Sequence, residues 1–78
     1  MTIEAIPIRE ETIRLGQFLK YAGLAESGAE ARQLIEEGEV SVGGQVELRR
    51  GRQLRAGDVV VVQTPGGTVG AEVGEPLK

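Results

Sequence analysis

The amino-acid sequence predicts an α+β domain in which two short N-terminal helices pack on a small, mainly antiparallel β-sheet. Three observations lead to this fold class. Apolar residues recur at helical spacing in the first half of the chain, valines alternate with other residues in the second half, and glycines separate these segments. The 78 residues allow one domain with a thin core, because folding at this size buries only about 60% of the surface.

The first predicted helix covers residues 15–22. Its apolar residues recur at the spacing i, i+3, i+4 and i+7, which is one face of a helix: Leu15, Phe18, Leu19 and Ala22. Gly23 follows directly, and glycine is common just after the last turn of a helix because it adopts a positive φ without strain. We therefore expect a short helix that ends before Gly23.

The second predicted helix covers residues 28–37 and has clearer signals at both ends. Ser27 and Glu30 fit a capping box, in which the serine hydroxyl accepts the third helical N–H and the glutamate carboxylate reaches back to the N–H of the serine. Gly38 suits the position after the last turn. Because only residues 24–26 link the two helices, they should form a helix–turn–helix-like hairpin.

The second half of the chain predicts β-strands. Valines alternate with other residues on both sides of Gly43-Gly44, a pair that suits the turn of a β-hairpin. Residues 49–55 predict a loop or an irregular strand. Residues 59–62 predict a strand that is buried on both faces or central in a small sheet. The segment 64–78 contains glycine and proline and predicts either a last strand or a flexible tail.

These elements divide the chain into three parts. Residues 1–11 predict an N-terminal arm or an edge strand, because Pro7 lacks the N–H that a central strand would donate. Residues 12–63 form the predicted α+β domain, and residues 64–78 form the tail that contains Gly and Pro.

The composition excludes most catalytic chemistry. The chain has no Cys and no His, which removes thiolate nucleophiles, Cys-containing zinc sites, the commonest metal ligand and the usual general base near neutral pH. A thin core also leaves little room for a deep substrate pocket. We therefore expect no enzyme activity, no cofactor, no bound metal and no small-molecule substrate.

The sequence also lacks signals for a membrane or for export. Its longest apolar run, residues 59–62, is far shorter than the ~20 residues that a membrane-spanning helix needs. The N-terminus has no basic region followed by an apolar stretch. We therefore expect a cytoplasmic protein.

Charge is distributed unevenly along the chain. The formal net charge is −3, which by itself argues against a nucleic-acid ligand. However, residues 1–47 contain nine acids and four bases, whereas residues 48–55 contain four arginines and no acid. An arginine guanidinium can donate two parallel hydrogen bonds to phosphate or carboxylate oxygens. This arginine run is the strongest chemical signal in the sequence.

The order of these features resembles a known family. The matching residues are Ser27, Ala31-Arg32-Gln33-Leu34-Ile35, Gly38, Val40, Val42, Gly44 and Gly57-Asp58. They are similar to the RNA-binding domain named after ribosomal small-subunit protein S-four, and the resemblance covers about residues 12–62. Three further segments resemble its small stand-alone bacterial members: Leu15-Gly16-Gln17-Phe18-Leu19-Lys20, Ser27-Gly28 and Arg49-Arg50-Gly51-Arg52.

The resemblance implies a compact α+β module that docks on structured RNA, often ribosomal or transfer RNA, without catalysis of its own. It implies the role of a ribosome-associated accessory factor. The chain departs from the family pattern at two places. Ser27-Gly28 stands where the family commonly has Ser-Arg, as in the stand-alone members, and Gly43-Gly44 stands where it commonly has Asn-Gly.

We predict eight RNA-binding residues: Arg49, Arg50, Arg52, Arg55, Arg32, Lys20, Ser27 and Gly44. The cations would contact phosphates, because A-form RNA hides its bases in a deep major groove and is recognised mainly by shape and backbone. The alternative is that the arginines pair with carboxylates such as those of Glu47, Glu39 or Glu36. We expect Tyr21 to pack half-buried rather than to stack on a base.

Two other functions stay open at this stage. An arginine-rich surface also suits an acidic protein partner, so the chain could be an interaction adaptor. Gly66-Gly67 faintly resembles the terminal Gly-Gly of ubiquitin-like carriers, although eleven residues follow it. The oligomeric state stays open as well.

Overall fold

The computed structural model describes residues 3–77, so residues 1–2 of the predicted arm and residue 78 of the predicted tail lie outside the described residues. The elements in chain order are β1 (Glu4–Ile8), β2 (Ile13–Arg14), α1 (Leu15–Tyr21), α2 (Gly28–Glu36), β3 (Val40–Val42), β4 (Gln45–Val46), β5 (Gln53–Leu54), β6 (Val59–Thr64) and β7 (Gly67–Pro76). The predicted α+β fold class is confirmed.

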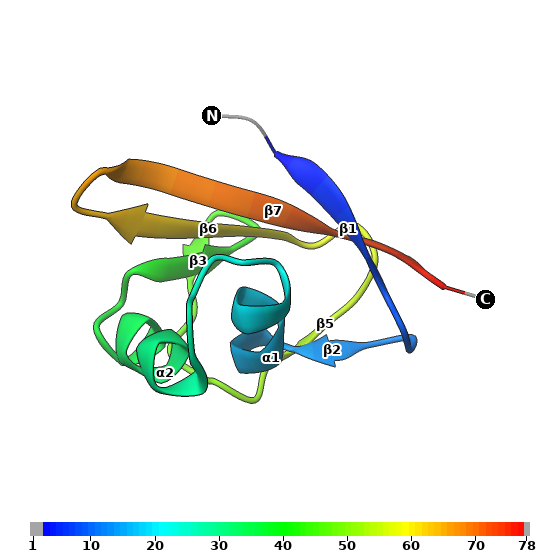
Figure 1. Cartoon of the computed structure of the whole chain (residues 1–78), viewed down its shortest axis with the longest axis horizontal. Helices are drawn as coiled ribbons and strands as arrows, with labels where there is room; N and C mark the ends of the chain where they lie inside the picture. The colour runs from blue at the N-terminus through cyan, green and yellow to red at the C-terminus, as the bar shows by residue number, and fades with distance from the viewer. Residues whose placement is uncertain (1–2, 78) are drawn as a thin grey trace.

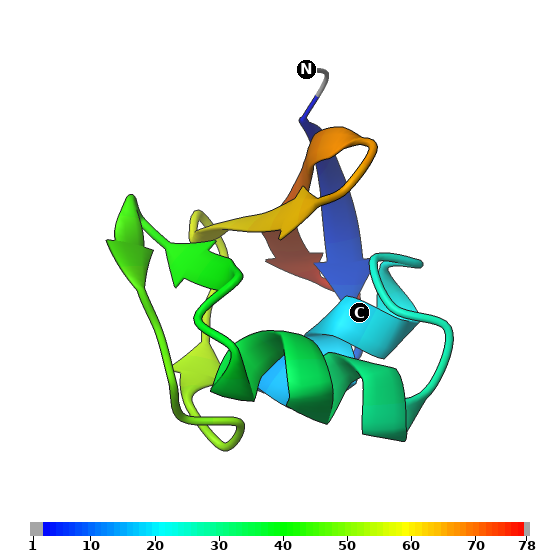
Figure 2. The ribbon, with the colours of Figure 1, turned by 90° about the vertical axis from the view of Figure 1, so that its left-hand side faces the viewer.

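Two sheets and two helices make up the fold. The large sheet has the strand order β1-β7-β6-β3-β4, and β2 and β5 form a separate two-stranded sheet. Only β1 and β7 pair in parallel, while the other pairs are antiparallel. Figures 1 and 2 show both helices on the same side of the large sheet. The sheet is therefore mixed and mostly antiparallel, with one face covered by the helices.

The core lies between the helices and the large sheet. Its largest fully buried side chains come from both helices and from five strands: Phe18, Ile8, Leu15, Leu19, Ile35, Leu54, Val40, Val60, Val62 and Val73. In β6, Val60 and Val62 are buried whereas Val59 and Val61 are half-buried, as the alternation of a strand requires. The central position predicted for this strand is confirmed, since β6 lies between β7 and β3.

Both helices end at glycines in the left-handed region. Gly23 and Gly38 have φ values of 77° and 76°. After α2, the Gly38 N–H donates to the Ile35 carbonyl at 3.1 Å and the Glu39 N–H donates to the Leu34 carbonyl at 3.0 Å, which is a Schellman motif. These bonds satisfy carbonyls that the helix leaves without partners, so the glycines fix both helix ends close to the predicted places.

The start of α2 differs from the prediction in one bond. The Glu30 N–H donates to the Ser27 hydroxyl at 3.1 Å, as expected for a serine cap. The Glu30 carboxylate, however, accepts from the N–H of Glu26 at 3.2 Å and not from that of Ser27. The extended backbone of Ser27, with φ −150°, brings the preceding N–H to the carboxylate instead.

The first and last strands of the described chain pair side by side in the large sheet. The segment after residue 64 forms β7, which pairs with β6 on one side and with β1 on the other. Ile8 of β1 and Val73 of β7 belong to the same buried core as the helices. Elements on both sides of the division predicted at residues 12 and 63 therefore share one core. The division itself stays a sequence-based prediction. Within residues 3–77, neither helix has the length and apolar character that crossing a membrane requires.

Candidate nucleic-acid interface

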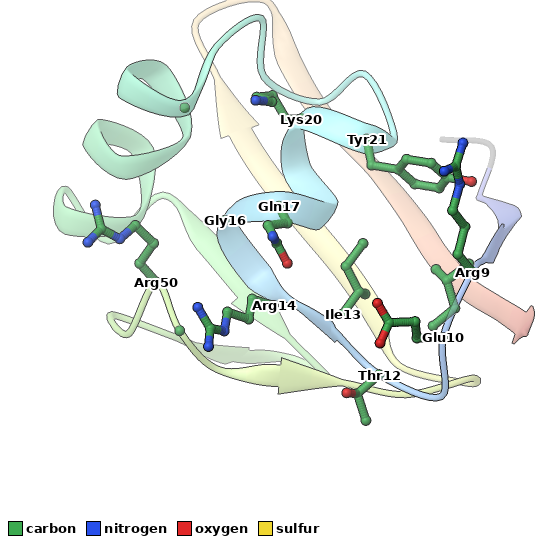
Figure 3. A pocket seen from close by; sticks show the side chains of 13 residues that line it. Arg9, Glu10, Thr12, Ile13, Arg14, Gly16, Gln17, Lys20, Tyr21 and Arg50 are labelled. Carbon is green, nitrogen blue, oxygen red and sulfur yellow. The ribbon is translucent and has the colours of Figure 1, made fainter.

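A shallow groove lies along the outer face of α1 (Figure 3). Its charged side chains are four cations and one carboxylate: Arg9, Arg14, Lys20, Arg50 and Glu10. The neutral residues in it include Thr12, Ile13, Gln17 and Tyr21. We call this surface the basic groove. Its charge contrasts with the net charge of the whole chain, which is −3.

Helix α1 orients the cations of the groove. Its residues Leu15, Phe18 and Leu19 are fully buried against the core. Because a helix places its other positions on the opposite face, Arg14 and Lys20 are held toward solvent. Arg14 is both the last residue of β2 and the residue that precedes the first turn of α1. The burial of the apolar face therefore fixes where these two charges point.

Backbone hydrogen bonds hold Arg50 against the start of α1. The Gly16 N–H donates to the Arg50 carbonyl at 3.0 Å, and the Leu15 N–H donates to the Arg52 carbonyl at 2.8 Å. These N–H groups belong to the first turn of the helix, where no intrahelical partner exists. A Cβ atom at Gly16 would lie 2.8 Å from Cγ of Arg50, so the arginine side chain packs directly on the glycine.

The four cations of the basic groove make no ion pair within residues 3–77. A cation that is not paired with a protein carboxylate can pair fully with an external anion. The groove can therefore offer several guanidinium and ammonium groups to the oxygens of one polyanion.

The arginine segment, which we define as residues 49–55, is partly neutralised by Glu47. The Arg52 Nη1 donates to Oε1 of Glu47 at 2.9 Å, and the Arg49 Nε and backbone N–H donate to Oε2 at 3.2 and 3.1 Å. The hydrogen bonds from Arg52 and then from Arg49 lower the pKa of Glu47 to about 2, against the effect of its burial. Glu47 is thus an almost fully buried carboxylate, 8% exposed, that anchors the segment.

A second shallow hollow lies on the arginine segment itself. It is lined by Arg49, Gly51, Arg52 and Gln53, and it shares Gly51 with the basic groove. Arg49 and Arg52 pair with Glu47, which is the alternative to phosphate binding that the sequence left open. Of the four arginines predicted as a clamp, Arg50 is the one that lines the basic groove.

The remaining predicted residues lie apart from the groove. Arg32 forms an exposed ion pair with Glu36, four residues later in α2, at 3.2 Å. Glu36 is one of the carboxylates that the sequence offered as partners of the arginines. Arg55 lies in the turn after β5, where its N–H donates to the Asp58 carboxylate at 2.8 Å. Neither arginine lines the basic groove or the second hollow. Their assignment to RNA binding stays a prediction.

The two small residues of the predicted set have clear structural roles. Gly44 follows Gly43 in the turn between β3 and β4, and both have positive φ, which the hairpin turn requires. Ser27 caps α2, and its neighbour Gly28 lines the basic groove next to Lys20. Replacement of a capping serine by alanine generally costs about 1 kcal/mol, so Ser27 has a structural role irrespective of any ligand.

The predicted set does not include Arg9 and Arg14, which line the groove. A usable signal was present for Arg14, because Arg14, Gln17 and Tyr21 recur at helical spacing on the face opposite the apolar stripe. Arg9 lies directly after β1, in the segment 8–14 that leads into α1 and lines much of the groove. No local pattern points to that contact.

Comparison with known proteins identifies the family. The family profile of the S4 domain matches residues 6–69. The chain is 47% identical over 58 residues to the probable ribosome maturation protein RlbA of Bacillus subtilis, which covers 74% of this chain and 82% of that protein. It is 44% identical over 48 residues to the putative RNA-binding protein YbcJ of Escherichia coli, which covers 62% and 69%.

A larger relative contains only a similar part. The tyrosine–tRNA ligase of Moorella thermoacetica is 38% identical over 60 residues, and the match covers 67% of this chain but 14% of the ligase. The two relatives of similar size are named as a ribosome maturation protein and an RNA-binding protein. With a family match over most of its length and relatives of its own size, this chain belongs to the S4 RNA-binding domain family, as a small member of it.

Proposed function

We propose that this protein binds structured ribosomal RNA through the basic groove and acts, without catalysis, as an accessory factor in ribosome maturation. The observation that carries this proposal is the set of four cations on one concave surface: Arg9, Arg14, Lys20 and Arg50. Such a surface matches the phosphates of a folded RNA, whose backbone and shape are more accessible than its bases. Phosphate contacts would supply most of the affinity.

Ribosomal RNA is favoured over transfer RNA by the relatives of similar size. A relative whose match covers 74% of this chain and 82% of its own length is named as a probable ribosome maturation protein. The transfer-RNA ligase shares only a small part of its length with this chain. A role on ribosomal RNA would place the protein in the cytoplasm.

The carrier alternative has little structural support. Gly66 and Gly67 lie at the hairpin between β6 and β7, where Gly67 pairs with Thr64. A ubiquitin-like carrier needs its Gly-Gly at a free end, whereas here β7 continues to Pro76 inside the sheet, between β1 and β6. The adaptor alternative predicts binding to an acidic protein that ignores RNA, which the following experiment distinguishes.

The test compares two variants that each remove two positive charges. Arg14→Gln/Lys20→Gln removes cations of the basic groove, and Arg32→Gln/Arg55→Gln removes exposed arginines outside it. Each phosphate contact contributes about 5-fold in affinity at about 0.1 M salt through counterion release, so the groove variant should bind a ribosomal RNA fragment about 25-fold more weakly. The control variant should lose much less.

The salt dependence gives a second readout. With about four phosphate contacts, the wild-type affinity should fall with salt at a log–log slope of about −3, and the groove variant should show a slope smaller by about 1.5. Equal losses in the two variants would show that general charge, and not the basic groove, drives binding. Binding that ignores salt would rule out phosphate recognition and support the adaptor.

A further inference from the structure

An exposed aromatic ring lies at one end of the basic groove. Tyr21 is 48% exposed, so about half of its surface faces solvent. Figure 3 shows Tyr21 beside Arg9 at the end of the groove away from Arg14 and Arg50. Tyr21 is the one tyrosine of the chain and, with Phe18 in the core, one of two aromatic residues. Its exposure therefore calls for a physical reason.

The ring of Tyr21 is held in place. Its hydroxyl donates to the Pro7 carbonyl at 2.9 Å, across 14 positions of the chain. Pro7 belongs to β1, which the parallel pairing with β7 fixes in the sheet. Tyr21 itself is the last residue of α1. The ring is thus tied at both its ends to regular structure, and its polar atom already has a partner.

The surroundings of this ring suit a flat and partly apolar ligand. Ile13, which is half-buried, lies between the arginine end of the groove and Tyr21 (Figure 3). Arg9 lies beside the ring, whereas Lys20 also lines the groove but points away from the ring (Figure 3). Phosphate recognition needs cations but has no use for an ordered aromatic face. A nucleotide with an unpaired base uses both, because its base stacks on the ring and its phosphate pairs with a cation.

The geometry points to a base-stacking site: one unpaired RNA base stacks on Tyr21, while Arg9 binds the phosphate next to it. This inference deepens the proposed function and rests on it. It names the ligand as RNA with an unpaired nucleotide beside a helix, and not as uniform duplex. One aromatic ring is sufficient for a single base, so the low aromatic content of the chain does not oppose the site.

The experiment uses three short RNA hairpins that differ at one position. The first carries a single bulged 2-aminopurine, the second carries an abasic residue at the bulge, and the third is fully paired. The abasic hairpin keeps the bulged backbone without the base, so it separates stacking from backbone shape. We expect the wild-type protein to bind the first hairpin about 5- to 100-fold more tightly than the other two, with quenched 2-aminopurine fluorescence.

Two variants of Tyr21 test the role of the ring. Tyr21→Leu keeps an apolar side chain but removes the ring, and it should abolish both the preference and the quenching. Tyr21→Phe keeps the ring and loses the hydrogen bond to Pro7, so it should retain most of both. Thermal unfolding of the variants checks that each is folded at the temperature of the binding assay.

The outcomes separate this inference from the proposed function. Equal, salt-dependent binding to all three hairpins, unchanged in Tyr21→Leu, would overturn the stacking site and leave the groove proposal standing. A preference for both bulged hairpins over the paired one, with no quenching, would also overturn it, because shape alone would then be recognised. Failure to bind any RNA would overturn the proposed function and this inference together.

Discussion

The basic groove and the arginine segment contain the same type of side chain, but the fold uses the two regions differently. The groove collects single cations from separate parts of the chain: Arg9, Arg14, Lys20 and Arg50. The arginine segment concentrates four arginines in seven consecutive positions, yet two of them, Arg49 and Arg52, bind the nearly buried carboxylate of Glu47. The arginine segment therefore has fewer cations without an ion pair than the basic groove, although its cations are closer together in the sequence.

This difference shows that charge density along a chain is a weak measure of binding capacity. A guanidinium that is already paired with a carboxylate must break or share that pair before it contacts a phosphate. Arg50 belongs to both regions and makes no ion pair with the described carboxylates. Its side chain packs on Gly16 and lines the groove. The position of one carboxylate, Glu47, decides which arginines are available.

The largest effect is expected for the double variant Arg49→Ala/Arg52→Ala. Its free energy of unfolding should fall by about 2 kcal/mol, because Glu47, with a side chain 10% exposed, would lose its ion-pair partners. We place the loss at the lower end of the range for buried pairs because the Arg49 side chain is 78% exposed and screened by water. Urea unfolding measures the stability.

The matched control for this variant is Arg14→Ala/Lys20→Ala. It removes two cations from the basic groove and should change stability by less than about 0.5 kcal/mol, because both side chains are exposed. Its RNA affinity should fall further than that of the Arg49→Ala/Arg52→Ala variant. If RNA affinity falls more in the arginine-segment variant, the comparison between the two regions is wrong.

A smaller effect, with a defined dependence on pH, is expected for Glu47→Gln. The pKa of Glu47 is about 2 in the fold against 4.5 for a free glutamate. The carboxylate therefore stabilises the fold fully above about pH 4.5, and its contribution is lost as the pH falls toward 2. A shift of this size corresponds to about 3 kcal/mol, and we expect about 1–2 because solvent screens Arg49.

The measurement is urea unfolding of wild type and Glu47→Gln at a series of pH values. The difference between them should be full near neutral pH, fall as the pH drops from about 4.5 toward 2, and vanish below pH 2, where Glu47 becomes protonated. Glu75→Gln, which removes an exposed carboxylate from β7, should show little difference at any pH. RNA affinity should rise in Glu47→Gln, because Arg49 and Arg52 are released. A fall would mean that Glu47 orients these arginines for RNA.

The smallest effect is expected for Gly16→Ala. The new Cβ would lie 2.8 Å from Cγ of Arg50 and would displace this flexible side chain from its place in the groove. RNA affinity should fall about 2- to 5-fold, the effect of weakening a single phosphate contact. Stability should change little, because the preference of a helix for alanine over glycine, up to about 1 kcal/mol, is offset by the displacement of Cγ of Arg50.

Gly28→Ala is the matched control for that substitution. Gly28 also lies in a helix and lines the groove, but a Cβ atom there would have nothing within 4 Å. Its RNA affinity should stay unchanged while its stability does not decrease. An equal loss of affinity in both variants would mean that groove shape, and not the position of Arg50, matters.

The helices were predictable because their signals are local. The Ser27 cap and the glycines at positions 23 and 38 act through neighbouring backbone atoms, and the structure places the helix ends within one residue of the prediction. The pairing of β1 with β7 was not predictable in this way. It joins Glu4 to Ala71, and such a contact depends on the packing of the whole domain and not on local pattern.

The site was predictable only in part, for the same reason. The predicted set includes Lys20 and Arg50, which line the basic groove, but no pattern in the sequence tells which arginines Glu47 would neutralise. That outcome depends on the loop geometry that brings Arg52 within 2.9 Å of the carboxylate. Arg9 was not in the predicted set, because it lies in the irregular segment between β1 and β2, where neither helical nor strand spacing indicates its direction. Tertiary structure decides which charges are free.

The parallel pairing of β1 with β7 has a consequence for the order of events during synthesis. β1 leaves the ribosome early, but its sheet partner spans Gly67–Pro76 and is translated more than fifty residues later. Until then β1 lacks the sheet partner that helps to hold Pro7 where the Tyr21 hydroxyl meets it. The Tyr21 end of the groove is therefore completed only when β7 has emerged, so a nascent chain of this protein cannot engage RNA with its full surface.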